Sequence, residues 1–161
     1  TVAALTSQIW LIRQDGTGQW RASDVGTVGA PSKIPLPVDI SMSADARSLW
    51  VNTFSDGMTR HFDVSDPEHP QQTYALHTGS QVNMISQSWD GTRLYITSSL
   101  LSHWDKTGAD NEQFLKGFRW DGHQLTQAFE VDFTKEKLGR PHHMKFSARP
   151  QQRVAMQRAG Y

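Results

Sequence analysis

Two stretches of the sequence decide the fold: Ile40-Ser41-Met42-Ser43-Ala44-Asp45-Ala46-Arg47-Ser48-Leu49-Trp50-Val51 and Ile85-Ser86-Gln87-Ser88-Trp89-Asp90-Gly91-Thr92-Arg93-Leu94-Tyr95-Ile96. Each reads as a strand, a polar turn at an aspartate and a second strand, and Asp90 follows Asp45 at an offset of 45 residues (90 − 45 = 45). Short strands that recur with a period of about 40 to 50 residues are typical of β-propeller blades. Because one blade cannot bury both of its faces, the repeat implies neighbouring blades. The sequence therefore predicts an all-β protein of the β-propeller class.

The length of the chain limits how much of a propeller it can hold. Its 161 residues fall short of the roughly 180 that four blades of this period need. The pattern predicts three blades, at about residues 5–36, 37–80 and 81–133, followed by a connector and tail at 134–161. We therefore expect residues 1–161 to form a partial propeller domain, with the remaining blades outside this chain.

Composition excludes several classes of function. Lys and Arg total 16, equal to Asp and Glu at 16, so no net positive field attracts nucleic acid. No run of 18 or more apolar residues is present, so we expect no membrane-spanning helix. Cysteine is absent, which excludes a disulfide or a thiol nucleophile within these residues.

The large apolar residues have a structural interpretation. The sequence contains six tryptophans, and we expect them to pack between blades, because buried indoles dominate such contacts. Met42 and Met84 stand on the repeated strands, where thioethers usually fill gaps in the core.

Three segments of the sequence, in order along the chain, form a familiar pattern. The longest is Ser88-Trp89-Asp90-Gly91-Thr92-Arg93-Leu94-Tyr95-Ile96-Thr97-Ser98-Ser99-Leu100 with Trp104-Asp105-Lys106. The others are Arg60-His61-Phe62-Asp63-Val64-Ser65-Asp66-Pro67 and Val131-Asp132-Phe133-Thr134-Lys135-Glu136-Lys137-Leu138-Gly139. Together they resemble the C-terminal part of the selenium-binding protein family, over roughly residues 37–146. That family has a seven-bladed propeller fold, so the resemblance implies about three blades of seven here.

The resemblance also implies a function. Bacterial members of the family are copper-dependent methanethiol oxidases, so a copper cofactor and a small thiol substrate are expected. The implied reaction converts methanethiol, O₂ and water into formaldehyde, hydrogen sulfide and hydrogen peroxide. The alternative is a non-catalytic propeller module that binds a metal or selenium. The family implies a periplasmic location, with the cytoplasm as the alternative, and the sequence identifies no catalytic residue.

The best candidate metal ligands are the adjacent histidines His142 and His143. Neutral imidazole binds copper, zinc and iron. Neighbouring residues of an extended strand point to opposite faces, so only one of the two would normally reach a given ion. The resemblance favours His142, which stands at the position of a family histidine, whereas His143 replaces a glutamate. The alternative is a histidine pair on a surface connection.

A second candidate pair lies in an insertion. Phe118 corresponds to Phe62 at an offset of 56 (118 − 62 = 56), about 11 residues more than the repeat, and the extra residues fall between 99 and 113. Insertions in repeat proteins often lie on the binding face. His103 and Asp105 stand in this insertion, and a carboxylate can orient an imidazole near a metal. The alternative for His103 is a solvated loop histidine.

Overall fold

The regular structure is almost entirely antiparallel β-sheet. The computed structural model describes residues 1–99 and 112–146. The elements in chain order are β1 (Val2–Ala3), β2 (Gln8–Gln14), β3 (Trp20–Thr27), the short 3₁₀ helix η1 (Pro31–Lys33), β4 (Pro37–Met42), β5 (Ser48–Thr53), β6 (Met58–Asp63), β7 (Gln71–His77), β8 (Val82–Gln87), β9 (Arg93–Ser98), β10 (Phe114–Trp120) and β11 (Leu125–Asp132). Strand β1 and helix η1 were not predicted from the sequence.

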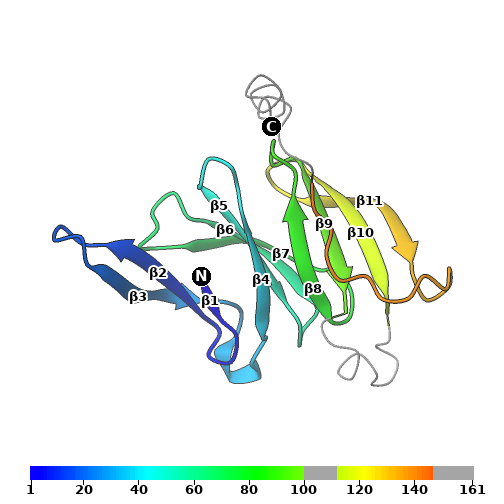
Figure 1. Cartoon of the computed structure of the whole chain (residues 1–161), viewed down its shortest axis with the longest axis horizontal. Coiled ribbons are helices and arrows are strands. Elements are labelled where there is room, and N and C mark those ends of the chain that lie inside the picture. Colours follow the sequence, from blue (N-terminus) through cyan, green and yellow to red (C-terminus); the bar gives the residue numbers. More distant parts are fainter. Residues whose placement is uncertain (100–111, 147–161) are drawn as a thin grey trace, which may run out of the picture.

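These strands form three sheets in which each strand pairs with its neighbours in sequence. The orders are β1-β2-β3, β4-β5-β6-β7 and β8-β9-β10-β11, all antiparallel. Figure 1 shows the sheets side by side, each twisted relative to the next. Four-stranded meanders arranged in this way are propeller blades. The predicted all-β propeller class is therefore confirmed.

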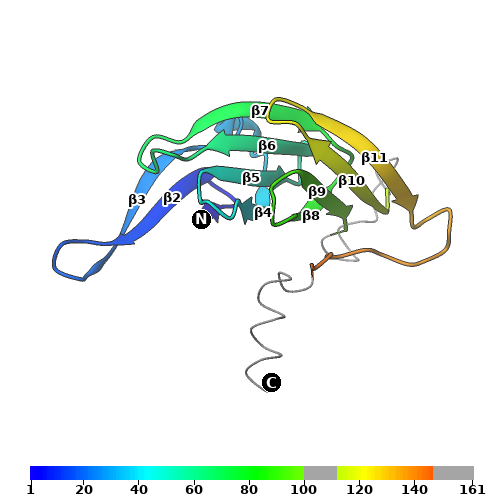
Figure 2. The ribbon, with the colours of Figure 1, turned by 90° about the horizontal axis from the view of Figure 1, so that it is seen from above.

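The sheets stand along an arc, with one strand of each on its inner side. In Figure 2, β4 and β8 lie on the concave side, and β3, β7 and β11 lie on the convex side. Strand β4 packs against β1 on one flank and against β8 on the other. The inner strands therefore face the region that would become the central channel of a closed propeller.

The repeated turn explains why the two quoted stretches fold alike. The Ser43 hydroxyl donates to Asp45 Oδ1 at 2.5 Å, and the Ser88 hydroxyl donates to Asp90 Oδ1 at 2.5 Å. The same two serine oxygens accept the backbone N–H five residues later, at 2.9 and 3.0 Å. The Ser88 and Thr92 hydrogen bonds lower the pKa of Asp90 to about 2. An ionised carboxylate thus holds each turn closed.

The second blade buries both faces of its second strand, β5. On β5, Leu49 and Val51 pack toward the first sheet, with Ile9 and Phe62. Trp50, which alternates with them, is fully buried between the second and third sheets. Alternation of this kind is the pattern of a strand between two neighbours.

The prediction that the tryptophans pack between blades was wrong for two of the described ones. Trp50 and Trp120 meet at 4.9 Å in an edge-to-face contact, as expected. Trp20 is 68% exposed and Trp89 is 50% exposed, and Met42, assigned to the core, is 55% exposed. Trp20 begins an outer strand, and Trp89 and Met42 lie at or beyond the ends of inner strands. None of these positions is covered by a neighbouring sheet.

The two remaining sequence predictions concern the His103–Asp105 pair and membrane-spanning helices. His103 and Asp105 lie outside the described residues, so their proposed pairing stays a prediction. Among residues 1–99 and 112–146, no helix is long and apolar enough to cross a membrane.

Candidate functional site

The segment from Pro141 to Phe146 runs along β8 as though it were the first strand of a further blade. Figure 1 shows it in orange beside β8. Pro141 is buried, as are Pro37 and Val82 at the starts of β4 and β8. His142 and His143 follow Pro141 directly; both are exposed, and residues 141–146 have no assigned strand.

Hydrogen bonds from the third sheet hold His142 at both its backbone and its ring. The buried Thr97 hydroxyl donates to the His142 carbonyl at 2.6 Å. The ring Nδ1 lies 3.3 Å from the carbonyl oxygen of Ser99, which also accepts the Asn83 side-chain amide at 2.9 Å. The Asn83 amide and the His142 ring both contact the Ser99 carbonyl oxygen, so Asn83 Nδ2 and His142 Nδ1 lie only 3.5 Å apart. Nδ1 then carries the proton, and Nε2 keeps the lone pair that a metal would use.

Asn83 is itself fixed from the neighbouring blade. It is fully buried, and the Asn52 amide donates to the backbone carbonyls of Asn83 and Met84 at 3.0 and 3.2 Å. The Thr59 hydroxyl in turn donates to Asn52 Oδ1 at 2.7 Å. The network is not fully paired, because Asn83 Oδ1 is buried without a hydrogen-bond partner among the described residues. The support for His142 still extends from β9 through β8 to β5 and β6.

His143 has a different partner, Ser86. The Ser86 hydroxyl donates its one hydrogen to the Met144 carbonyl at 2.5 Å, so its oxygen accepts toward His143 Nε2 at 3.2 Å. His143 therefore carries its proton on Nε2 and its lone pair on Nδ1. The two rings are oriented by separate groups and offer opposite nitrogens.

A carboxylate on the neighbouring inner strand faces the histidine pair. Asp39 Oδ2 accepts the backbone N–H of Ile85 at 2.8 Å, which ties β4 to β8. Burial raises the pKa of Asp39; the backbone N–H groups of Ile85 and Ile40 oppose that rise, and His143 and His142 oppose it less. Asp39 therefore adds a partly buried acid to the polar inner face.

The described residues can supply only part of a metal site. Across residues 1–99 and 112–146, no group of three or more His, Asp or Glu side chains is placed to hold an ion. Oriented neutral imidazoles do suit copper, and a carbonyl that fixes the other ring nitrogen is the usual support for such a ligand. His142 and His143 fit copper as one or two ligands of a larger set.

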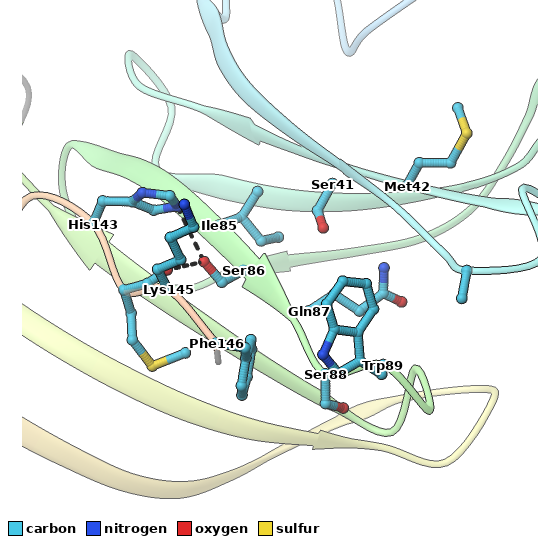
Figure 3. A pocket seen from close by; sticks show the side chains of 12 residues that line it. Ser41, Met42, Ile85, Ser86, Gln87, Ser88, Trp89, His143, Lys145 and Phe146 are labelled. Atoms are coloured by element: carbon cyan, nitrogen blue, oxygen red, sulfur yellow. Dashed lines mark hydrogen bonds between the residues drawn. The ribbon is translucent and has the colours of Figure 1, made fainter. Parts of the chain in front are cut away.

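A pocket of about 320 Å³ adjoins His143. Strands β4 and β8 and residues 143–146 form its walls. Figure 3 shows His143 beside Ser86, with the rings of Phe146 and Trp89 farther toward the end of β8. The Phe146 ring is held in an edge-to-face contact with Tyr95 at 5.2 Å. The pocket therefore places apolar rings beside a candidate metal ligand.

Sequence analysis missed the residues that support the histidines. Asn83, Thr97 and Ser86 are buried polar residues on strands whose cores are apolar, with Val82 and Ile85 on β8 and Leu94 and Ile96 on β9. A polar side chain at such a position needs a partner, and this was the available signal. For Thr97 and Ser86 the partner lies 45 and 57 residues away, so the sequence alone could not name it.

Fold and site define the class of protein: part of a β-propeller in which a segment beside the inner strand β8 carries an exposed histidine pair. The model of the 56 kDa selenium-binding protein family matches residues 1–149, and the chain belongs to that family. The chain is 59% identical over 149 residues to a methanethiol oxidase from Hyphomicrobium sp., covering 92% of this chain and 34% of that protein. It is 30% identical to the human methanethiol oxidase, over 84% of this chain and 39% of that protein.

Solved structures give the same architecture. A hypothetical selenium-binding protein from Sulfolobus tokodaii matches 81% of this chain with a TM-score of 0.68 and 26% identity, over 36% of its own length. A periplasmic gluconolactonase from Pseudomonas aeruginosa matches 91% of this chain, and 38% of its own, with a TM-score of 0.69 at 18% identity, which shows the fold alone. The chain spans about a third of the length of the curated relatives it matches.

Proposed function

We propose that the protein to which this chain belongs is a copper-dependent methanethiol oxidase. The observation that carries the proposal is the 59% identity to the Hyphomicrobium methanethiol oxidase over nearly the whole chain. The proposed reaction is CH₃SH + O₂ + H₂O → HCHO + H₂S + H₂O₂. A periplasmic location is part of the same proposal and rests on the resemblance of the sequence to bacterial members.

In this proposal His142 binds copper through Nε2, and parts of the protein outside this chain supply the remaining ligands. Bound copper would activate the thiol and oxygen toward electron transfer. The chain's own contribution is orientation, because Thr97 and Ser99 hold His142 and Ser86 holds His143 before any metal arrives. Preorganised ligands bind a metal without first losing rotamer freedom.

The test uses the full-length protein and two variants, His142→Ala and His123→Ala. His123 is an exposed residue at the turn between β10 and β11, and it serves as the matched control. Copper content after dialysis and thiol-dependent oxygen uptake are measured for each. We expect His142→Ala to bind copper at least about tenfold more weakly, and His123→Ala to match the wild type.

The outcomes separate the alternatives. Unchanged copper affinity in His142→Ala would remove this residue from the ligand set. Copper-loaded protein that consumes no oxygen with methanethiol would favour the non-catalytic, metal-binding module. Wild-type protein that retains no copper would contradict the cofactor itself.

A further inference from the structure

Met42 is the most exposed methionine that the structure describes. It is 55% exposed at the end of β4, whereas Met58, Met84 and Met144 are half-buried. Oxidation of a thioether requires that a dissolved oxidant reach the sulfur, so susceptibility follows exposure. Among the described methionines, Met42 is therefore the one that an oxidant in solution reaches most readily.

Met42 borders open space on two sides. It lines the pocket of about 320 Å³ that adjoins His143, and also a cavity of about 450 Å³ between the first and second sheets, where Ile9 and Leu49 form other parts of the wall. Figure 3 shows the sulfur of Met42 at the tip of its side chain, clear of the other labelled residues. Strand β4 lies on the concave side of the arc, and in a closed propeller this side surrounds the central channel. A small solute in that channel would meet the Met42 thioether.

The repeat shows that the fold accepts a polar group at this position. Met42 is the last residue of β4, and Gln87 is the last residue of β8, at the offset of the repeat (87 − 42 = 45). Methionine sulfoxide and glutamine are both long, unbranched side chains that carry a polar oxygen. Sulfoxide formation disrupts a protein when the methionine lies in a core, and Met42 does not. Oxidation of Met42 should therefore leave the blade folded.

The proposed reaction supplies the oxidant, because hydrogen peroxide is one of its products. We propose that Met42 is a reversible oxidation site that takes up peroxide released into the channel. The thioether sulfur attacks one peroxide oxygen, the O–O bond breaks, and a proton moves to the leaving hydroxide: R–S–CH₃ + H₂O₂ → R–S(O)–CH₃ + H₂O. The sulfur is oxidised and the peroxide is reduced to water. Methionine sulfoxide reductases reverse the change. The inference rests on the proposed function for the source of the peroxide and for nothing else.

The experiment separates the site from the source of the oxidant. In the first arm, copper-free full-length protein receives dilute hydrogen peroxide. In the second arm, copper-loaded full-length protein turns over in oxygenated buffer with or without methanethiol, and oxygen uptake is recorded. Both are digested with trypsin, and mass spectrometry measures the gain of one oxygen atom in each methionine peptide.

The sequence provides internal controls for this measurement. Cleavage after Lys and Arg, except before Pro, places each described methionine in a different peptide. Met42 falls in residues 34–47, which contain no other methionine and no tryptophan or tyrosine. Met58, Met84 and Met144 fall in residues 48–60, 61–93 and 138–145. The three half-buried methionines therefore serve as matched controls within one sample.

In the first arm we expect the Met42 peptide to gain oxygen at least about twofold faster than the other three, in proportion to exposure. Methionine sulfoxide reductase should remove that oxygen. In the second arm the same peptide should gain oxygen with methanethiol and not without it. Met42→Gln, which imitates the sulfoxide, should keep the melting temperature and copper content of the wild type.

Equal rates in the four peptides with added peroxide would overturn the site. A lower melting temperature for Met42→Gln would overturn its tolerance of oxidation. Oxygen uptake with methanethiol but no gain of oxygen at Met42 would refute the proposal that released peroxide reaches it. Selective oxidation of Met42 by added peroxide, together with no oxygen uptake on methanethiol, would refute the oxidase function and leave the oxidation site standing.

Discussion

Replacing Thr97 by valine tests whether the third sheet holds the histidine segment in place. Thr97 is 3% exposed, and its hydroxyl donates to the His142 carbonyl at 2.6 Å. Valine keeps the β-branched shape that suits β9 and removes only the donor. One neutral hydrogen bond contributes about 0.5–1.5 kcal/mol net, which corresponds to a factor of about 2 to 13 in an equilibrium constant.

The direct readout is amide hydrogen exchange of residues 142–146 in the full-length protein. Exchange there reports local opening of the segment, so Thr97→Val should accelerate it by about 2- to 13-fold. Copper affinity should fall by no more than the same factor, because a released segment must be ordered again before its histidine can bind. If the segment is firmly docked without metal, the affinity changes less than the exchange rate does.

Thr126→Val is the matched control, since Thr126 is exposed on the outer strand β11. We expect it to leave exchange at residues 142–146 and copper affinity unchanged. A folded Thr97→Val protein with wild-type exchange across this segment would refute the reasoning, because the hydroxyl would then contribute nothing to docking.

Three further perturbations test the fold. Trp50→Ala should lower the free energy of unfolding by about 3–5 kcal/mol in urea titration, because the side chain is fully buried between two sheets; a loss below 1 kcal/mol would contradict that packing. Burial lowers the pKa of His61, so the unfolded chain binds more protons than the folded one below about pH 6.5. The free energy of unfolding should therefore fall as the pH drops from 7.5 to 5.5. His61→Gln should reduce this loss, and an equal loss in the variant would exclude His61 as its source. Ser88→Ala should lower the free energy of unfolding by about 1–2 kcal/mol, because the Ser88 hydroxyl donates to Asp90 Oδ1 and accepts the backbone N–H of Arg93. An unchanged melting temperature would show that the turn closes without this hydroxyl.

The fold could be predicted because the information for it is local and occurs twice. The turn residues Ser43 and Asp45 recur as Ser88 and Asp90, and strands on both sides alternate or run apolar as sheet packing demands. The second strand of the first quoted stretch, after the turn at Asp45, therefore falls within β5 (Ser48–Thr53). Exposure was predicted less well, because Met42 is the last residue of β4 and Trp89 lies two residues past the end of β8 (89 − 87 = 2). Hydropathy cannot tell the last buried position from the first exposed one there.

The candidate site could be predicted only in part, because its geometry is non-local. The sequence singled out His142 and His143 as adjacent imidazoles, and the family resemblance favoured His142 alone. Their orientation depends on Ser99 and Ser86, some 43 and 57 residues earlier in the chain. No spacing rule connects these positions, since the third blade carries an insertion that breaks the 45-residue period.

Comparison among the repeats separates structural from functional residues within one chain. Positions that agree between blades, such as Ser43 and Ser88, make the same hydrogen bonds and close the same turn. Positions that differ, such as Ala44 and Trp89, occupy equivalent places in the two turns, so closing the turn does not explain their difference. The second position of the inner strands also differs, because Val38 of β4 is succeeded by the buried amide Asn83 of β8. The Asn83 amide lies 3.5 Å from His142 Nδ1, so the blade in which this position becomes polar is the one that contacts the histidine segment.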